Sequence, residues 1–195
     1  MTADWPFRAE TIAARLALIA RHIHRKSAPL PAFKYIPLPA AIVDAPIDAD
    51  PSDWEQIAHE SYWGQADLNF VMKSHFTVPE RWDKDQIALH LPLGGLGDIF
   101  NHPEALVHVD LAPIGSADRY HHTIPLAAEL ADGQRHTLAL HGWTVLAGWP
   151  PDPAAKNKLH MKPPALVQRD PDVRAFVQLG QTVLDSARTT YAASP

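Results

Sequence analysis

Prolines are the feature of this sequence that most restricts its fold. The chain has 19 of them in 195 residues, roughly twice the usual share of about 5%, and they lie between short apolar runs. Proline interrupts helices and central strands because it has no backbone N–H and its ring clashes with the preceding turn. This distribution predicts many short strands separated by turns.

Residues 68–78, LNFVMKSHFTV, show the clearest strand pattern. Leu68, Phe70, Met72, Phe76 and Val78 recur with a period of two, which is typical of a half-buried strand. The remaining strand-like runs are residues 86–93, 104–111, 118–126 and 134–146. The turns expected between them are at residues 94–98, 112–117 and 132–133. These runs predict a central β-sandwich of jelly-roll type.

Helical patterns lie at the two ends of the chain. In residues 8–26 the apolar side chains recur at helical spacing, which predicts an amphipathic helix, and a second helix is expected near the C-terminus. A proline-rich stretch after the first helix has no helical period, and its AFKYI segment is a possible strand. We therefore expect a mainly β fold with flanking helices. Its expected divisions are a helix and extended wrap over 1–52, the sandwich over 53–168 and a C-terminal helix over 169–195.

Composition excludes several classes of function. The net charge is −5, which provides no basic footprint for nucleic acid. There is no cysteine, so disulfides, thiolate nucleophiles and cysteine-ligated zinc are excluded. No apolar run approaches the roughly 18 residues of a membrane span, and the N-terminus has no signal-peptide pattern. We expect a soluble, cytoplasmic protein with neither nucleic acid nor membrane as a partner.

Histidines raise the question of a metal site, because the chain has 12 of them. His121 and His122 are adjacent in a predicted strand, so their side chains should point to opposite faces. His136 and His141 are separated by an odd number of residues and should also lie on opposite faces. A zinc site needs three or four convergent ligands. We therefore expect no metal ligand in this chain, although a small metal-dependent hydrolase remains a third hypothesis.

Carboxylates near residues 102–126 are the candidates for a glycosidase-type acid pair. Glu104 and Asp110 would lie on the same strand face but roughly 20 Å apart, which is too far for such a pair. Asp118 is followed by Arg119 and is better suited to an ion pair or a turn cap. We interpret all three carboxylates as structural.

Tryptophans could provide a stacking platform for sugars. The chain has six, and we single out Trp63, Trp143 and Trp149. Tryptophan also fills cores and interdomain contacts, because its large ring carries a single polar N–H. The tryptophans are therefore compatible with sugar binding and with packing.

Four segments together resemble a known family. They are YWGQADLNFVMKSHFTVPERW, HPEALVHVDLAPIGSADRYHHTIPL, LALHGWTV and PPALVQRDPDVRAF. They look like the N-terminal region of α-mannosidases of glycoside hydrolase family 38, in the cytosolic and bacterial branch. The resemblance covers residues 5–188 and is most specific at Pro103–Asp110 and Asp118–His122. One departure is Leu111, where the family usually has glycine.

The resemblance implies a supporting rather than a catalytic role. In this family a helical and β-sandwich region precedes a catalytic barrel, whose H-x-H-x-D-x-x-W metal motif and nucleophile have no counterpart here. We therefore expect this chain to be inactive alone and to contain no cofactor. A full-length family enzyme would bind zinc or another divalent metal in its barrel. The C-terminal helix would lead towards that barrel.

The resemblance also indicates the partners. They would be the α-mannosidase catalytic barrel, in cis or as a separate chain, together with mannose-containing glycans or a second copy of the chain. The alternative hypothesis is a free-standing carbohydrate-binding module. The residues expected to contact the barrel or a glycan are Trp63, Glu104, Asp110, Asp118, Arg119, His121, His122, Trp143 and Trp149.

Overall fold

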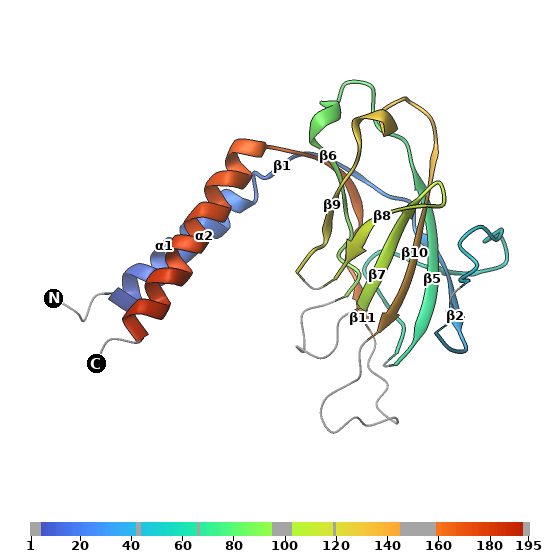
Figure 1. The fold of residues 1–195 in the computed structure, drawn as a ribbon, viewed down its shortest axis with the longest axis horizontal. Helices are drawn as coiled ribbons and strands as arrows, with labels where there is room; N and C mark the ends of the chain where they lie inside the picture. The colour runs from blue at the N-terminus through green and yellow to red at the C-terminus, as the bar shows by residue number, and fades with distance from the viewer. Residues whose placement is uncertain are drawn as a thin grey trace. The chain divides into compact units, whose positions relative to one another are not determined.

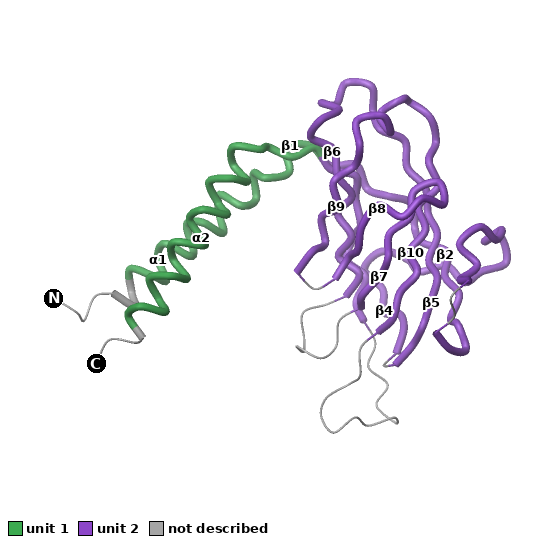
Figure 2. Tube along the Cα trace, in the orientation of Figure 1, with its two compact units in different colours: residues 1–26, 168–195 green, residues 27–167 purple. Residues whose placement is uncertain are grey.

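A mainly β architecture with a helix at each end confirms the expected fold class. The computed structural model describes residues 5–41, 44–65, 67–94, 103–118, 120–144 and 159–192. These form two compact units, one comprising residues 1–26 and 168–195 and the other residues 27–167 (Figure 2). The first unit holds the helices α1 (Trp5–Ala20) and α2 (Pro171–Ala192), and the second is the β-sandwich (Figure 1).

In the described residues, the strands form three sheets. The largest is antiparallel, in the order β3 (Glu55–Ile57), β2 (Phe33–Leu38), β5 (Asn69–Phe76), β10 (His136–Thr144), β7 (Pro103–Val109) and β8 (Ala112–Ala117). A four-stranded sheet contains β1 (His24–Pro29), β12 (Ala165–Arg169), β6 (Ile87–His90) and β9 (Thr123–Pro125). A small sheet pairs β11 (Leu159–Met161) with β4 (Ser61–Trp63). Single turns of 3₁₀ helix lie at Lys84–Gln86 (η1) and Ala128–Leu130 (η2).

The core lies between the two larger sheets. Phe70, Met72 and Leu140 of the six-stranded sheet share one buried cluster with Leu89 and Leu166 of the four-stranded sheet. The period of two in residues 68–78 therefore marks the inward face of β5, as the sequence predicts. The FKYI part of the AFKYI segment lies in strand β2. Because β1 and β2 pair within the sheets, the structure groups residues 27–52 with the sandwich.

The first helix is shorter than its pattern predicts. It ends at Ala20, and a turn follows in which the Ile23 N–H donates to the Ala20 carbonyl at 3.1 Å. The next residues form β1, so His24 and its neighbours are extended rather than helical. Pairing of β1 in the sheet outweighs the local helical preference, since propensity is a weak determinant beside tertiary contacts.

The second helix begins where the sequence indicates. Asp170 is its N-cap, and its Oδ1 accepts hydrogen bonds from the backbone N–H groups of Asp172 and Val173, both at 3.0 Å. Pro171 occupies the first helical position, where a missing N–H costs nothing. The Arg25 guanidinium lies 2.7 Å from the other carboxylate oxygen of Asp170. This cap ties the start of α2 to the segment that follows α1.

The turn between β7 and β8 is not where the sequence predicts it. Residues 112–117 form strand β8, and the reversal occurs at Asp110 and Leu111, which have φ angles of +48° and +71°. Two consecutive residues with positive φ are typical of a tight hairpin turn whose twist matches its strands. Pro113 and Gly115 suggested a turn, but an edge strand tolerates both. The pairing also shifts register between Val107 and His108.

Leu111 is a strained residue in this turn, which gives a testable prediction. A β-carbon in the left-handed region costs roughly 1–2 kcal/mol, and glycine avoids that cost. Leu111→Gly should therefore raise the free energy of unfolding by about 1 kcal/mol, measured by urea denaturation. The matched control is Leu106→Gly in β7, which should lower stability because glycine weakens a strand. Destabilisation by both variants would contradict the prediction.

Candidate functional site

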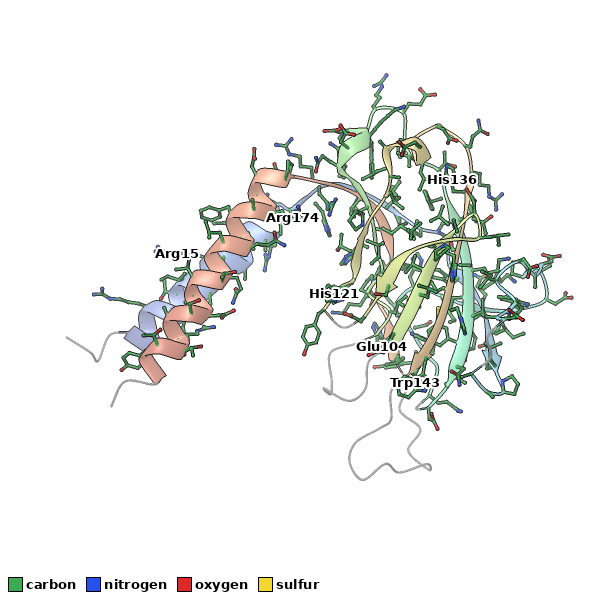
Figure 3. The ribbon with its side chains drawn as sticks, in the orientation of Figure 1. Arg15, Glu104, His121, His136, Trp143 and Arg174 are labelled. Atoms are coloured by element: carbon green, nitrogen blue, oxygen red, sulfur yellow. The ribbon has the colours of Figure 1, made fainter. Side chains whose placement is uncertain are left out.

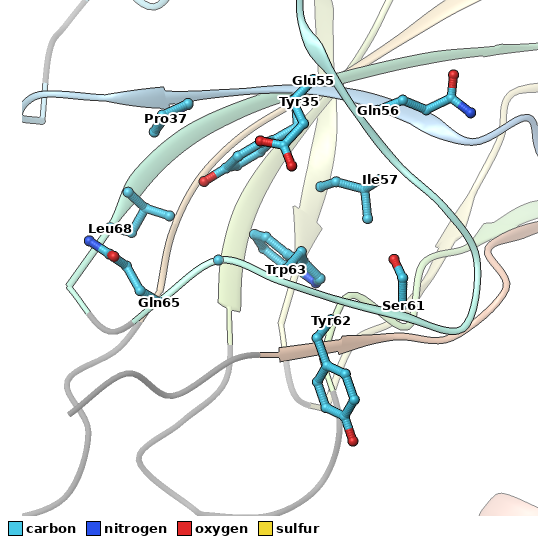
Figure 4. Close-up of a pocket in the computed structure, with 11 residues that line it drawn as sticks. Tyr35, Pro37, Glu55, Gln56, Ile57, Ser61, Tyr62, Trp63, Gln65 and Leu68 are labelled. Atoms are coloured by element: carbon cyan, nitrogen blue, oxygen red, sulfur yellow. The ribbon is translucent and has the colours of Figure 1, made fainter.

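A pocket of about 370 Å³ lies beside β2, β3 and β4 and is the best candidate for ligand binding (Figure 4). It combines aromatic, carboxylate and amide side chains in one place. The residues that line it are Tyr35, Pro37, Glu55, Gln56, Ile57, Ser61, Tyr62, Trp63, Gly64, Gln65 and Leu68. Of these, only Trp63 belongs to the set predicted from sequence.

Trp63 forms part of the core beneath this pocket. Its side chain is buried, and its ring makes edge contacts with Tyr35 and Phe70 at centroid distances of 5.9 and 5.1 Å. Its Nε1–H donates to the Leu93 carbonyl at 2.8 Å. A ring held in this way shapes the pocket, whereas stacking on a sugar would require an exposed face. The exposed neighbour Tyr62 points away from Tyr35 and Trp63 (Figure 4).

Tyr35 and Glu55 supply the polar chemistry of the pocket. They are opposite each other on β2 and β3. Burial of the phenol, together with the nearby Glu55 carboxylate, raises the pKa of Tyr35 to about 12. Tyr35 is therefore a neutral phenol at physiological pH, while the exposed Glu55 can accept hydrogen bonds. With the amides of Gln56 and Gln65, this set can bind a polyhydroxylated ligand, but it has one carboxylate rather than the pair that glycoside hydrolysis uses.

Asp118 and residues 120–122 lie in a loop, not in the strand that the sequence suggests. Asp118 Oδ1 accepts hydrogen bonds from the backbone N–H groups of Tyr120 at 2.6 Å and His121 at 2.7 Å. The His121 ring nitrogen lies 2.9 Å from Asp118 Oδ2, and that of His122 lies 3.2 Å from the Asp118 carbonyl oxygen. Both histidines therefore contact one aspartate instead of alternating between faces. Aspartate offers the local backbone an alternative to strand pairing, and β9 begins only at Thr123.

Asp118 is ionised over the usual pH range. Partial burial acts to raise the pKa of its carboxyl, but hydrogen bonds from His121 and the two backbone N–H groups hold that pKa below its ordinary value. Within the described ranges, no three His, Asp or Glu side chains converge as a metal ion would require. Arg119 and Trp149 lie outside the described residues.

Glu104 and Trp143 are brought together on neighbouring strands. They are directly opposite in the pairing of β7 with β10, near one end of the sheet (Figure 3). The Trp143 Nε1–H donates to Asp67 Oδ1 at 3.2 Å. Asp110 follows the other end of β7, so Glu104 and Asp110 do not form an acid pair.

Asp110 instead belongs to a cluster that the sequence pattern did not identify. The buried His136 at the start of β10 has Nδ1 2.7 Å from Asp110 Oδ2 and Nε2 3.0 Å from Asp132 Oδ1. The Thr137 N–H also donates to Asp110 Oδ1 at 2.8 Å. The cluster joins the β7–β8 turn to β10. The one sequence signal for it was the four-residue spacing of Asp132 and His136 across a glycine turn.

The interactions of His136 predict that the stability of the protein depends on pH. Burial acts to lower its pKa, but the hydrogen bonds and charges of Asp110 and Asp132 raise that pKa above its ordinary value of 6.5. Its stabilising contribution is therefore complete below pH 6.5 and is lost as pH rises through the folded-state pKa. The pKa values of the two aspartates are lowered despite partial burial, chiefly by the Gln134 N–H at Asp132 and by His136 at Asp110. Their contribution is present above about pH 4 and is lost in more acidic solution.

The measurement compares urea unfolding of the wild type and His136→Gln at pH 5 and pH 8.5. We expect the variant to be less stable by about 1–2 kcal/mol at pH 5 and closer to the wild type at pH 8.5. Using the difference between the two proteins removes the opposing effects of His24, His75 and His108, whose pKa values burial lowers. His22→Gln, at an exposed histidine after α1, serves as the control, and an equal loss for His136→Gln at both pH values would contradict the assignment.

Comparisons with known proteins do not assign the chain to a family. No family model matches it, and no curated protein matches it either. Neither described helix is sufficiently long and apolar to cross a membrane.

Proposed function

We propose that this chain is the non-catalytic β-sandwich region of an α-mannosidase, which supports or borders a separate catalytic barrel. The observation that carries the proposal is the Asp118 loop, because it lies within the most specific part of the family resemblance. In its described residues, the loop is ordered by hydrogen bonds from the backbone N–H groups of Tyr120 and His121 to the Asp118 carboxylate. A supporting domain in the cytoplasm also agrees with the absence of cysteine from the chain.

The Asp118 loop has the properties of a contact surface. Tyr120 is 76% exposed, and the His121 side chain is 73% exposed. The backbone of both residues is fixed by the Asp118 carboxylate. An aromatic side chain on a pre-ordered backbone loses little conformational freedom on binding, and aromatic residues often dominate the affinity of interfaces. This supports recognition of a partner protein through Tyr120 and His121.

The test uses the purified chain and a separately produced catalytic barrel of a family 38 α-mannosidase. With zinc supplied, the chain alone should not hydrolyse an aryl α-mannoside, but it should form a one-to-one complex with the barrel in size-exclusion chromatography. Tyr120→Ser should weaken that complex at least tenfold, while Tyr62→Ser, a similarly exposed tyrosine elsewhere on the sandwich, should not. Hydrolysis by the chain alone, or no complex at all, would overturn the proposal.

Carbohydrate binding is the second candidate function, and the Tyr35–Glu55 pocket is the observation that favours it. A neutral phenol, a carboxylate and two amides can satisfy several hydroxyl groups of a small sugar at once. Calorimetry with mannose and mannobioses should then give millimolar binding that Glu55→Gln weakens. Asp53→Asn is the control because Asp53 does not line the pocket. An absence of binding heat at millimolar sugar would eliminate this candidate.

A further inference from the structure

The second helix has two adjacent apolar stripes, of which α1 covers one. The covered stripe contains Gly180 and Leu184. Leu184 is buried, and a β-carbon at Gly180 would lie 2.7 Å from Leu16 Cδ2, so the two helices approach closely there. The second stripe, which we call the outer stripe, begins with Phe176, Leu179 and Val183. Their exposed fractions are 56%, 67% and 60%.

The spacing of the outer stripe is that of a helix–helix contact. Phe176, Leu179, Val183, Ser186 and Thr190 follow one another at intervals of three and four residues. This heptad-like spacing marks a seam that packs against another helix. A helix with two such seams side by side has two neighbours, as in a four-helix bundle.

A groove between α1 and α2 extends this apolar face. It has a volume of about 320 Å³ and is lined by Ile12, Leu16, Phe176, Leu179, Gly180, Val183, Leu184 and Ala187. The two helices α1 and α2 form a helical hairpin. By contrast with the groove, the buried core of this hairpin consists of Ala9, Leu16 and Leu184, with Ala13 packed against it. Much of the large apolar surface of the hairpin is therefore left in water.

We propose that a second copy of this chain covers the groove, so that two hairpins form a four-helix bundle. Charge distribution favours an identical partner. The residues that flank the outer stripe on α2 are Ala175, Gly180, Thr182 and Ala187, all small and uncharged. Like charges at such flanking positions would repel an identical chain. Two copies of α2 can approach along the outer stripe without that repulsion.

The polar end of the outer stripe can also be buried at little cost. The hydroxyl groups of Thr182, Ser186 and Thr190 donate to backbone carbonyls one turn earlier, at 3.0, 2.8 and 3.0 Å. Burial of a hydroxyl is costly mainly when its hydrogen bond is lost. These donors keep their partners when a second helix packs over them.

The size of the face agrees with a stable dimer. The two helices have 16 and 22 residues. Side by side they present a strip about 30 Å long and about 20 Å wide, which is roughly 600 Å² of flat area. Standard interfaces bury about 800 Å² on each partner. The hairpin alone can therefore supply most of the required contact.

The test is sedimentation equilibrium of the full chain from about 1 to 200 μM. The mass should rise from 21.5 kDa towards twice that value. Leu179→Asp should increase the dissociation constant at least tenfold, because it places a charge in the seam. Leu18→Asp is the matched control, since Leu18 is 55% exposed on α1 but does not line the groove. Circular dichroism verifies that both variants keep their helices.

Cysteine cross-linking gives an independent measurement. The chain has no cysteine, so Leu179→Cys introduces a single thiol at the middle of the apolar part of the outer stripe. Mild oxidation should yield a disulfide-linked dimer for Leu179→Cys and much less of it for Leu18→Cys. A constant mass of 21.5 kDa over the whole concentration range, or equal effects at the two leucines, would overturn the proposal. Binding of the groove by a catalytic barrel without self-association would overturn it as well.

Discussion

Gly142→Ala should lower the free energy of unfolding by about 3 kcal/mol or more, the largest effect we expect from a single methyl group. Gly142 lies in the middle of the six-stranded sheet, opposite Phe70 of β5 and Ala105 of β7. An added β-carbon would be 2.5 Å from the Glu104 carbonyl oxygen, 2.6 Å from Phe70 Cζ and 2.9 Å from Ala105 Cβ. The Glu104 carbonyl oxygen can move away only if β7 separates from β10.

Urea denaturation of Gly142→Ala beside Gly115→Ala measures this effect. Gly115 lies in the same sheet, but its added β-carbon would meet only the Ile124 side chain, at 3.3 Å. We expect Gly115→Ala to cost less than about 1 kcal/mol, as substitutions with room to relax usually do. Similar losses in the free energy of unfolding for the two variants would show that the close approach of β7 to β10 is not the cause of the effect.

Thr144→Val should cost about 2–3 kcal/mol, although the two side chains have nearly the same shape. The fully buried Thr144 accepts a hydrogen bond at Oγ1 from the Leu68 N–H at 2.9 Å and donates one to the Gln65 carbonyl at 2.5 Å. Valine leaves both backbone groups without this partner, and each such loss costs roughly 1–3 kcal/mol when the group is buried.

This substitution should also affect the Tyr35–Glu55 pocket, because Gln65 and Leu68 line it. The measurements are urea denaturation and, for any sugar that the wild type binds, calorimetry on the folded variant. Thr137→Val is the control, since Thr137 is an exposed threonine on the same strand and should change stability by less than about 0.5 kcal/mol. Equal stability of Thr144→Val and the wild type would contradict the assigned role of the hydroxyl.

The sequence predicts the strands whose side chains alternate most regularly. Phe70 and Met72 in β5 and Ile87 and Leu89 in β6 are buried as their period of two requires. Prediction was wrong where a local signal competed with pairing or with a side-chain hydrogen bond. The helix ends at Ala20 because β1 joins a sheet. Residues 120–122 form a loop because Asp118 accepts hydrogen bonds from the backbone of Tyr120 and His121.

The candidate site was harder to predict than the fold, because its residues come together only through strand register. Tyr35 and Glu55 are 20 residues apart, and they meet because β2 pairs with β3. Trp63 was singled out as a large aromatic residue, but its alternation with Tyr62 along β4 decides which ring is buried. The Asp110–His136 contact likewise depends on a two-residue turn that the sequence placed elsewhere.

The irregular β8 strand also determines how this sheet can meet other proteins. An edge strand with free N–H and carbonyl groups is a template on which another chain can add a strand, and long regular edges of this kind promote aggregation. Pro113 provides no N–H at this edge, and the register shift at Val107 and His108 interrupts its regularity. Growth of the sheet by strand addition is therefore disfavoured at β8.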